Sequence, residues 1–458
     1  MKLFVPEPAI TLYEHGFDDH DLLDRKAQGE HLSNLVENIS DPMVIALDAE
    51  WGSGKTVFLK CWVGEHLKTE AHQAQTIYFD AFEHDFMNDP LIALIGAIDA
   101  RFPQDRDNEH LKTLKNVVPW LARTGLRGVL AYATAGATEI TGALGDAAWN
   151  TISRSADQQI DQFWKQERQK QQSLQDFKHA LTELAKDRKL VIVIDELDRC
   201  RPDFALSMLE ILKHLFHVPN VHFVLGVNLT ALEHSVHARY GAGIDAGRYL
   251  KKFYNLIFEL TDSNPQNSPY DQKIRYAEKV FKDAGMEINR EKSPLGFRII
   301  KILLQDKLTK RLSFRDINQI YTNAAITQPS CDRGSYALSL ISLLLILKTV
   351  NHSLYQRAVN LEYVAEEIFG LFDISMKDLG SLKGNDLNLF DDNEYFYLAM
   401  KDVIVYFAKT PADFLDKEVL ESFDYRFLLQ DKDREGARKI SFERSVLTPL
   451  KSFKLSNT

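Results

Sequence analysis

The stretch MVIALDAEWGSGKT, residues Met43–Thr56, decides the fold. Its first six residues form an apolar run with a β-branched centre that ends at Asp48, as expected of a short buried strand. A turn with two glycines follows, and from Lys55 onward the apolar residues recur at helical spacing. The sequence therefore predicts a strand, a tight turn and a helix in direct succession.

The turn, Ala49–Thr56, matches the phosphate-binding pattern G-x-x-x-x-G-K-[ST] at every fixed position except the first, where alanine stands. Gly52 and Gly54 allow backbone N–H groups to turn toward phosphate oxygens, and Lys55 supplies a cation for the β- and γ-phosphates. The hydroxyl of Thr56 is a ligand suited to Mg²⁺. The residues expected to surround the nucleotide are Glu50, Trp51, Gly52, Ser53, Gly54, Lys55 and Thr56.

A second run, LVIVID at Leu190–Asp195, is continuously apolar, which indicates a strand buried on both faces of a parallel sheet. It ends in the acidic pair Asp195 and Glu196. Because ligands bind at the carboxyl ends of such strands, we expect Asp195 to hold Mg²⁺ through a water and Glu196 to polarise the attacking water. A solvated acidic turn is the alternative interpretation.

Three further runs predict strands at Thr76–Phe79, Val221–Asn228 and Leu256–Leu260, separated by helical patterns. Strands that alternate with helices indicate a doubly wound α/β sheet. Asn228 ends the fourth strand, where its amide could orient the water or the γ-phosphate; a capping role in the turn is the competing account.

Two basic clusters lie near the fifth predicted strand in the sequence or after it. The first, which precedes that strand, contains Arg248, Lys251 and Lys252, and the second, around the start of a later helix, contains Arg311 and Arg315. A cation from either cluster could stabilise transition-state charge on the γ-phosphate, in cis or from a neighbouring subunit. Basic clusters are more often solvated surface, so this role is a hypothesis for each residue.

The composition of the 458 residues excludes several classes of protein. With 45% hydrophobic and 26% charged residues, the chain can bury a core and is not a disordered or fibrous sequence. The net charge of -10 has the wrong sign for coating duplex DNA, so nucleic acid could bind only at a local patch. Three widely spaced cysteines and the absence of an apolar signal sequence favour the cytoplasm.

Taken together, these segments resemble the KAP family of P-loop ATPases. The resemblance spans roughly residues 20–325, and its most specific pieces are the tryptophan before GSGKT and the string DELDRCRP at 195–202. The matching blocks are Asp21–Val36, LDAEWGSGKT, Phe79–Ile95, Val191–Pro202, FVLGVN, RYLKKFYNLIFEL and Arg311–Ala324.

The resemblance implies a five-stranded, mainly parallel sheet of the additional-strand, catalytic-acid type. In that type, the fourth strand lies between the phosphate-loop strand and the Asp-Glu strand. It also implies a helical lid after the fifth strand, to which Arg311 and Arg315 would belong. Bacterial members of the family are often linked with defence against phage and plasmids.

On this basis the chain divides into a nucleotide-binding core at 1–262, a helical lid at 263–330 and a C-terminal helical region at 331–458. The core carries a helical insertion at about 105–186, in the interval where some family members have membrane-spanning hairpins. Here, charged residues interrupt the Ala/Gly-rich segment 116–150, and its apolar runs are shorter than a span. We expect a helical insertion without a transmembrane span, with membrane-surface association as the alternative.

The function predicted from the sequence is Mg²⁺-dependent ATP hydrolysis, in which nucleotide state rearranges the helical regions and, through them, a protein partner or a homo-oligomer. A guanine-reading N-K-x-D string is absent from the sequence, and Glu196 favours water over a substrate hydroxyl as the nucleophile. A nucleotide-binding switch or scaffold with little hydrolysis remains the alternative.

Overall fold

The computed structural model describes residues 9–18, 20–87, 89–102, 172, 174–260, 269–286, 294–303, 311–328, 338–372, 394–408, 439, 441–447 and 450. Residue contacts divide the chain into two units. One consists of Ile10–Asp21 and Arg25–Thr261, and the other contains Leu22–Asp24 and the chain from Asp262 onward.

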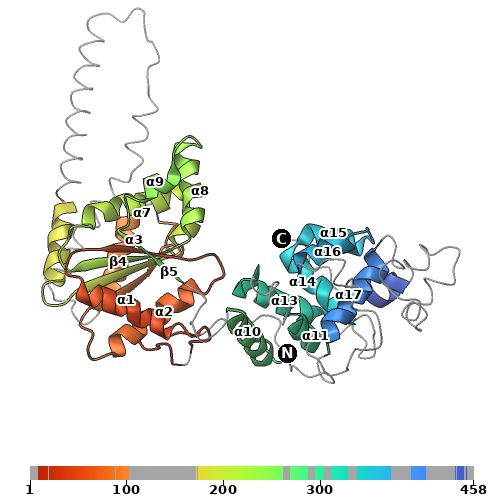
Figure 1. Ribbon diagram of the computed structural model, residues 1–458. Coiled ribbons are helices and arrows are strands. Elements are labelled where there is room, and N and C mark those ends of the chain that lie inside the picture. The colour runs from red at the N-terminus through yellow and green to blue at the C-terminus, as the bar shows by residue number, and fades with distance from the viewer. Residues whose placement is uncertain are drawn as a thin grey trace, which may run out of the picture. The chain divides into compact units, whose positions relative to one another are not determined.

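A five-stranded parallel sheet forms the centre of the first unit (Figure 1). The strands are β1 (Val44–Asp48), β2 (Gln75–Asp80), β3 (Leu190–Asp195), β4 (Val221–Val227) and β5 (Leu256–Glu259). Their order is β2-β3-β4-β1-β5, so β4 lies between the phosphate-loop strand and the Asp-Glu strand. The predicted fold class is confirmed, and the predicted strands differ from the observed ones by one residue or less at each end.

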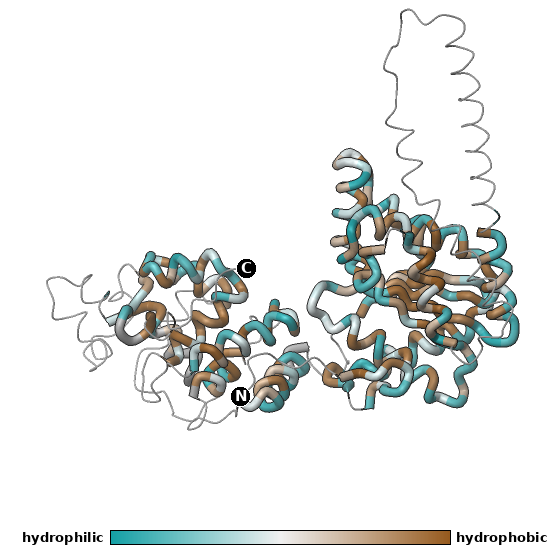
Figure 2. The backbone as a smooth tube through the Cα atoms, turned by 180° about the vertical axis from the view of Figure 1, so that it is seen from behind, coloured by the Kyte–Doolittle hydropathy of each residue, from teal (hydrophilic) through white to brown (hydrophobic). Residues whose placement is uncertain are grey.

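Helices cover both faces of this sheet, because alternate residues of its central strands are apolar on each side. Val44 and Ala46 of β1 pack into a core with α3, α7 and α8, whereas Ile45 and Leu47 pack with α1 and α2. Figure 1 shows these two helical layers, and Figure 2 shows the hydrophobic strands between them. The helices are α1 (Lys26–Asn38), α2 (Lys55–Lys68), α3 (Pro90–Arg101), α7 (Pro202–Leu215), α8 (Leu229–Tyr240) and α9 (Ala246–Leu250).

The edge strand β5 differs from the central strands. Leu256 is 39% exposed and Ile257 is 40% exposed, although β3 and β4 are buried throughout. β5 pairs with β1 on one side only, since it ends the described strand order. The apolar residues of β5 are therefore explained by their preference for strands and not by their burial in the core.

Local sequence signals explain where several helices begin and end. Asp89 caps the start of α3 by accepting from the Leu91 N–H at 2.9 Å, and Pro90 occupies the first helical turn. A residue distant in the sequence caps the C-terminal end of α1. The hydrophobic periodicity of the sequence did not predict this helix. The Lys189 ammonium, one residue before β3, donates to the carbonyls of Val36, Glu37 and Ile39.

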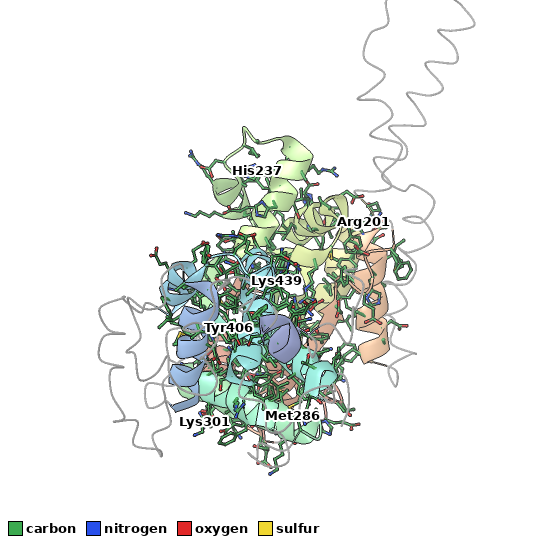
Figure 3. All side chains as sticks on the ribbon, turned by 90° about the vertical axis from the view of Figure 1, so that its right-hand side faces the viewer. Arg201, His237, Met286, Lys301, Tyr406 and Lys439 are labelled. Atoms are coloured by element: carbon green, nitrogen blue, oxygen red, sulfur yellow. The ribbon has the colours of Figure 1, made fainter. Side chains whose placement is uncertain are left out.

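The second unit is helical and has one continuous core, which extends from Ile274 to Val446 and includes Leu23. Ser313 and Asp316 form a capping box at the start of α13, in which each side chain accepts from the other's backbone N–H. Figure 3 labels Met286 and Tyr406, which belong to this core. The helices are α10 (Pro269–Asp283), α11 (Pro294–Leu303), α13 (Phe314–Thr327), α14 (Leu338–Val350), α15 (His352–Val359), α16 (Ala365–Leu371) and α17 (Glu394–Phe407), followed by η6 (Glu443–Leu447).

The insertion predicted at about 105–186 lies outside the described residues except at its C-terminal end, where residues 174–184 are helical. Segment 116–150, for which membrane-surface association was the alternative, lies entirely outside them. Within the described ranges, no helix has both the length and the apolar character needed to cross a membrane. The apolar helix α14 is instead buried in the core of its own unit.

Candidate functional site

The glycine turn after β1 has the backbone that its sequence requires. Gly52 and Gly54 adopt positive φ values of 78° and 82°, a region that side chains disfavour. Gly54 is the residue before the first turn of α2, so the N–H groups at the helix start face the loop. A negatively charged group held there would also be stabilised by the helix dipole.

Lys55 is enclosed by the loop and by the turn after β3. Its side chain is buried, with the ammonium 3.3 Å from the Ala49 carbonyl and 3.8 Å from Asp198 Oδ1. Burial lowers the pKa of Lys55, while the negative charges of Asp198 and Asp195 oppose this shift. The loop therefore holds a buried ammonium group with an acidic partner close by.

Asp195, at the end of β3, is completely buried, and each of its carboxylate oxygens accepts a hydrogen bond. Tyr78 of β2 donates to Oδ2 at 3.0 Å, and the Glu196 N–H donates to Oδ1 at 2.9 Å. Burial raises the pKa of Asp195 to about 6, against the opposing effects of the Thr56 hydroxyl, the Lys55 ammonium and the Tyr78 hydroxyl. The carboxylate group of Asp195 is of the hard oxygen type that Mg²⁺ prefers.

Glu196 bends the chain away from the strand. Its backbone has a positive φ of 58°, uncommon for a residue other than glycine, and this conformation opens the turn that follows. Its Oε1 accepts from the Thr56 hydroxyl at 3.1 Å, and Arg199 Nη1 donates to its carboxylate at 2.8 Å. The structure thus brings together Lys55, Thr56, Asp195 and Glu196, and their roles toward a nucleotide stay predictions.

Two further contacts to the phosphate loop were not predicted from the sequence. The Trp51 indole Nε1 donates to Asp198 Oδ2 at 2.5 Å, so Asp198 contacts two residues of the loop. The guanidinium of Arg25, which is 2% exposed, donates to the Ser53 carbonyl at 2.7 Å. Arg25 and Asp198 both lie in blocks that resemble the KAP family, but no local pattern indicates what their side chains contact.

The donor set suits a magnesium nucleotide. The Ser53 hydroxyl is buried within the loop and, among the described residues, has no hydrogen-bond partner, so it is available to a phosphate oxygen. Thr56 and Asp195 supply the hydroxyl and carboxylate oxygens that Mg²⁺ prefers. The residues present therefore fit Mg²⁺ and a nucleoside phosphate.

The remaining predicted site residues have other contacts, are exposed, or belong to the other unit. Asn228 caps α8, accepting from the Ala231 N–H at 3.1 Å, and its role toward water stays a prediction. Arg248 is exposed on α9, where only its backbone N–H has a hydrogen bond among the described contacts. Arg311 and Arg315 belong to the helical unit, where Arg311 donates to the Leu371 carbonyl at 3.3 Å. Their roles toward the nucleotide also remain predictions.

Comparison with known proteins assigns a family to most of the chain. The family model described as the KAP family P-loop domain matches residues 25–328. That interval contains every residue of the cluster around Lys55 and Glu196. A search of curated proteins gives no match.

Two matching solved structures show a distant likeness. The ADP form of the Aeropyrum pernix ORC2 protein is 13% identical to this chain, with a TM-score of 0.34, and the match covers 86% of this chain and 87% of that one. The same protein in its ADPNP-ADP complexes is 14% identical, with a TM-score of 0.35 and coverage of 82% and 84%. A likeness at these values carries no information about function.

Proposed function

The chain belongs to the KAP family of P-loop domains, and on this premise we propose that it is an Mg²⁺-dependent ATP hydrolase in which Glu196 activates the attacking water. One observation carries the proposal: Glu196 Oε1 lies 3.1 Å from the hydroxyl of Thr56. A general base and a Mg²⁺ ligand are thus adjacent at the carboxyl edge of the sheet, as hydrolysis of a bound nucleotide requires.

Each residue of the cluster has a separate task in this proposal. Lys55 and the N–H groups of the loop bind the β- and γ-phosphates, and the Thr56 hydroxyl and Asp195, through water, would hold Mg²⁺. When bound, the metal would neutralise negative charge on the phosphate oxygens. Glu196 accepts the proton of the attacking water, since its carboxylate is at the edge of this group of ligands.

The decisive experiment compares purified wild-type protein with Lys55→Ala and Glu196→Gln in ATP-binding and turnover assays. We expect Lys55→Ala to lose ATP binding, and Glu196→Gln to bind ATP but hydrolyse it roughly 100-fold or more slowly. Lys68→Ala, an exposed change at the opposite end of α2, is the matched control and should behave as wild type. Tight ATP binding without wild-type turnover would instead support a nucleotide-binding switch.

ATP is proposed as the nucleotide because the sequence lacks a guanine-reading string. Competition of ATP hydrolysis by unlabelled GTP, CTP and UTP tests this choice. Inhibition by GTP at the same concentration as ATP would argue against it.

We also propose that nucleotide state acts on a protein partner or a second copy of this chain. The support is Arg248, whose guanidinium is exposed and, among described residues, makes no hydrogen bond or ion pair. If Arg248 acts in trans, turnover per molecule will rise with protein concentration, and Arg248→Ala will abolish that rise. Arg239→Ala, an exposed change on the neighbouring α8, is the control.

The biological setting proposed is bacterial defence against phage or plasmids, and it rests on the family resemblance alone. Phage plating on bacteria that express the wild type or Lys55→Ala tests it. Equal plating efficiency on the two strains for a broad phage panel would count against this setting.

A further inference from the structure

The turn that follows β3 brings an arginine against the proposed general base. Leu197–Arg199 form one turn of 3₁₀ helix, in which the Arg199 N–H donates to the Glu196 carbonyl at 3.1 Å. A 3₁₀ helix has three residues per turn, so side chains three positions apart eclipse one another. Arg199 therefore returns to the same side of the chain as Glu196.

The two side chains make a close, charge-assisted contact. Arg199 Nη1 lies 2.8 Å from each carboxylate oxygen of Glu196. The Thr56 hydroxyl also donates to Oε1 of Glu196, at 3.1 Å. The Glu196 side chain is only 12% exposed, so little water competes with these partners. Arg199 and Thr56 thus both contact this carboxylate.

Neighbouring residues of the same turn have other partners, which distinguishes the contact that the Arg199 guanidinium makes. It binds the acid that follows β3 directly, whereas Asp198 binds the phosphate loop through Trp51 and lies beside Lys55. Arg201, two residues later and labelled in Figure 3, donates instead to the carbonyls of Asp85 and Met87 in the segment after β2. Within this short arginine-rich segment, Arg199 is thus the residue directed at Glu196.

We propose that Arg199 is a positioning residue for the hydrolytic reaction, which holds the Glu196 carboxylate beside Thr56 in the orientation needed to accept a proton from water. This inference rests on the proposed function. Much of the rate increase that a general base provides depends on its alignment with the reacting water, since misplacement by about 1 Å can reduce a rate by roughly 100-fold. Nη1 of Arg199 contacts both carboxylate oxygens of Glu196, and a charge-assisted contact of this kind limits the rotation of the carboxylate.

The test measures ATP turnover, ATP and ADP affinity and thermal stability for Arg199→Ala, Arg199→Gln and Arg199→Lys. Arg199 is 31% exposed, so these substitutions leave the core intact, and Arg199→Gln serves if the alanine variant folds poorly. We expect Arg199→Ala to lower kcat by about 10- to 100-fold while ATP affinity stays within about twofold, and Arg199→Lys to recover part of the loss. Arg201→Ala is the matched control and should retain wild-type turnover.

A double-mutant cycle shows whether Arg199 acts through Glu196. If it does, adding Arg199→Ala to Glu196→Gln will cause no further loss of turnover, whereas independent roles would give multiplied losses. The inference is overturned if Arg199→Ala keeps or raises kcat, if the double variant shows multiplied losses, or if ATP affinity falls while ADP affinity does not. The last result would mean that the guanidinium contacts the γ-phosphate.

The same measurements separate this inference from the proposed function. Wild-type turnover that depends on Glu196 but not on Arg199 would overturn the positioning role alone. Absence of turnover in the wild type would overturn the hydrolase and the positioning role together.

Discussion

Gly226 of β4 is paired in register with Asp195 of β3, and a Cβ atom at position 226 would overlap the Oδ1 atom of that carboxylate. The same Cβ atom would also meet Leu59 of α2. Position 226 thus has no room for a side chain, because the buried carboxylate and the helix behind it occupy the space.

We therefore predict that Gly226→Ala displaces Asp195. The added methyl should lower the free energy of unfolding by about 1–3 kcal/mol and reduce ATP turnover by roughly 100-fold. Urea denaturation and a turnover assay measure the two effects. Gly96→Ala, on the exposed face of α3 with no atom near the added Cβ, is the control; it should stabilise the protein by about 0.5–1 kcal/mol.

Trp51→Phe tests the contact between the phosphate loop and Asp198. The substitution keeps an aromatic ring but removes the indole N–H that donates to the buried carboxylate. We expect the free energy of unfolding to fall by about 1–3 kcal/mol, because a buried charged acceptor loses a donor. ATP affinity should also weaken, since the loop is less firmly held. A variant as stable as the wild type would show that this hydrogen bond adds no net stability.

The buried residue His66 predicts a loss of stability in mild acid. The Ser33 hydroxyl accepts from Trp62 Nε1 at 2.9 Å and is also hydrogen-bonded to His66 Nδ1 at 2.9 Å. His66 Nε2 faces Glu37 Oε1 at 3.2 Å, and the ring of His72 stacks on that of His66. Burial, aided by the neighbouring His72, lowers the pKa of His66 to about 4.

The direction of the pH effect on stability follows from the protonation of His66 in the folded and the unfolded protein. Between pH 6.5 and about 4 the unfolded chain binds the proton and the folded protein does not, so the free energy of unfolding falls as the pH falls. His66 alone contributes a slope of up to about 1.4 kcal/mol per pH unit. The pKa of buried His222 is also lowered to about 4, so the wild type has more than one such contribution. The difference between denaturation curves of the wild type and His66→Gln across this range isolates His66, and identical slopes would contradict the prediction.

Lys189→Met tests the remote cap of α1. The ammonium group donates to three carbonyls at the end of that helix, and a methionine of similar length keeps the packing but removes every donor. We expect a loss of about 1–3 kcal/mol in the free energy of unfolding. Arg188→Met removes a neighbouring exposed cation and should change stability little. Equal effects of the two substitutions would show that the cap contributes nothing specific.

The sequence predicts this fold well because its signals are local. Buried parallel strands appear as continuous apolar runs, so β3 is predicted at its observed bounds. The phosphate loop is a contiguous motif whose backbone depends on Gly52 and Gly54. Asp195 and Glu196 follow from their position at a strand end.

The contacts that the sequence does not reveal depend on geometry between distant segments. Arg25 and Ser53 are 28 positions apart, and only the packing of α1 against α2 brings them together. The pairing of Arg199 with Glu196 depends on the positive φ of Glu196 and on the 3₁₀ turn that follows it, and no local sequence pattern indicates this backbone. The constraint on Gly226 appears only when the register of β3 and β4 is known.

The strand order has a consequence for biosynthesis. β1 and β3 do not pair with each other; both pair with β4, which the ribosome makes after them. In a nascent chain that ends before Val221, the loop of Lys55 follows β1 and Glu196 follows β3. The strand that pairs with both, β4, is not yet present. We expect the contact between Thr56 and Glu196 to form only after β4 has been synthesised, because β4 is the described strand that joins β1 to β3.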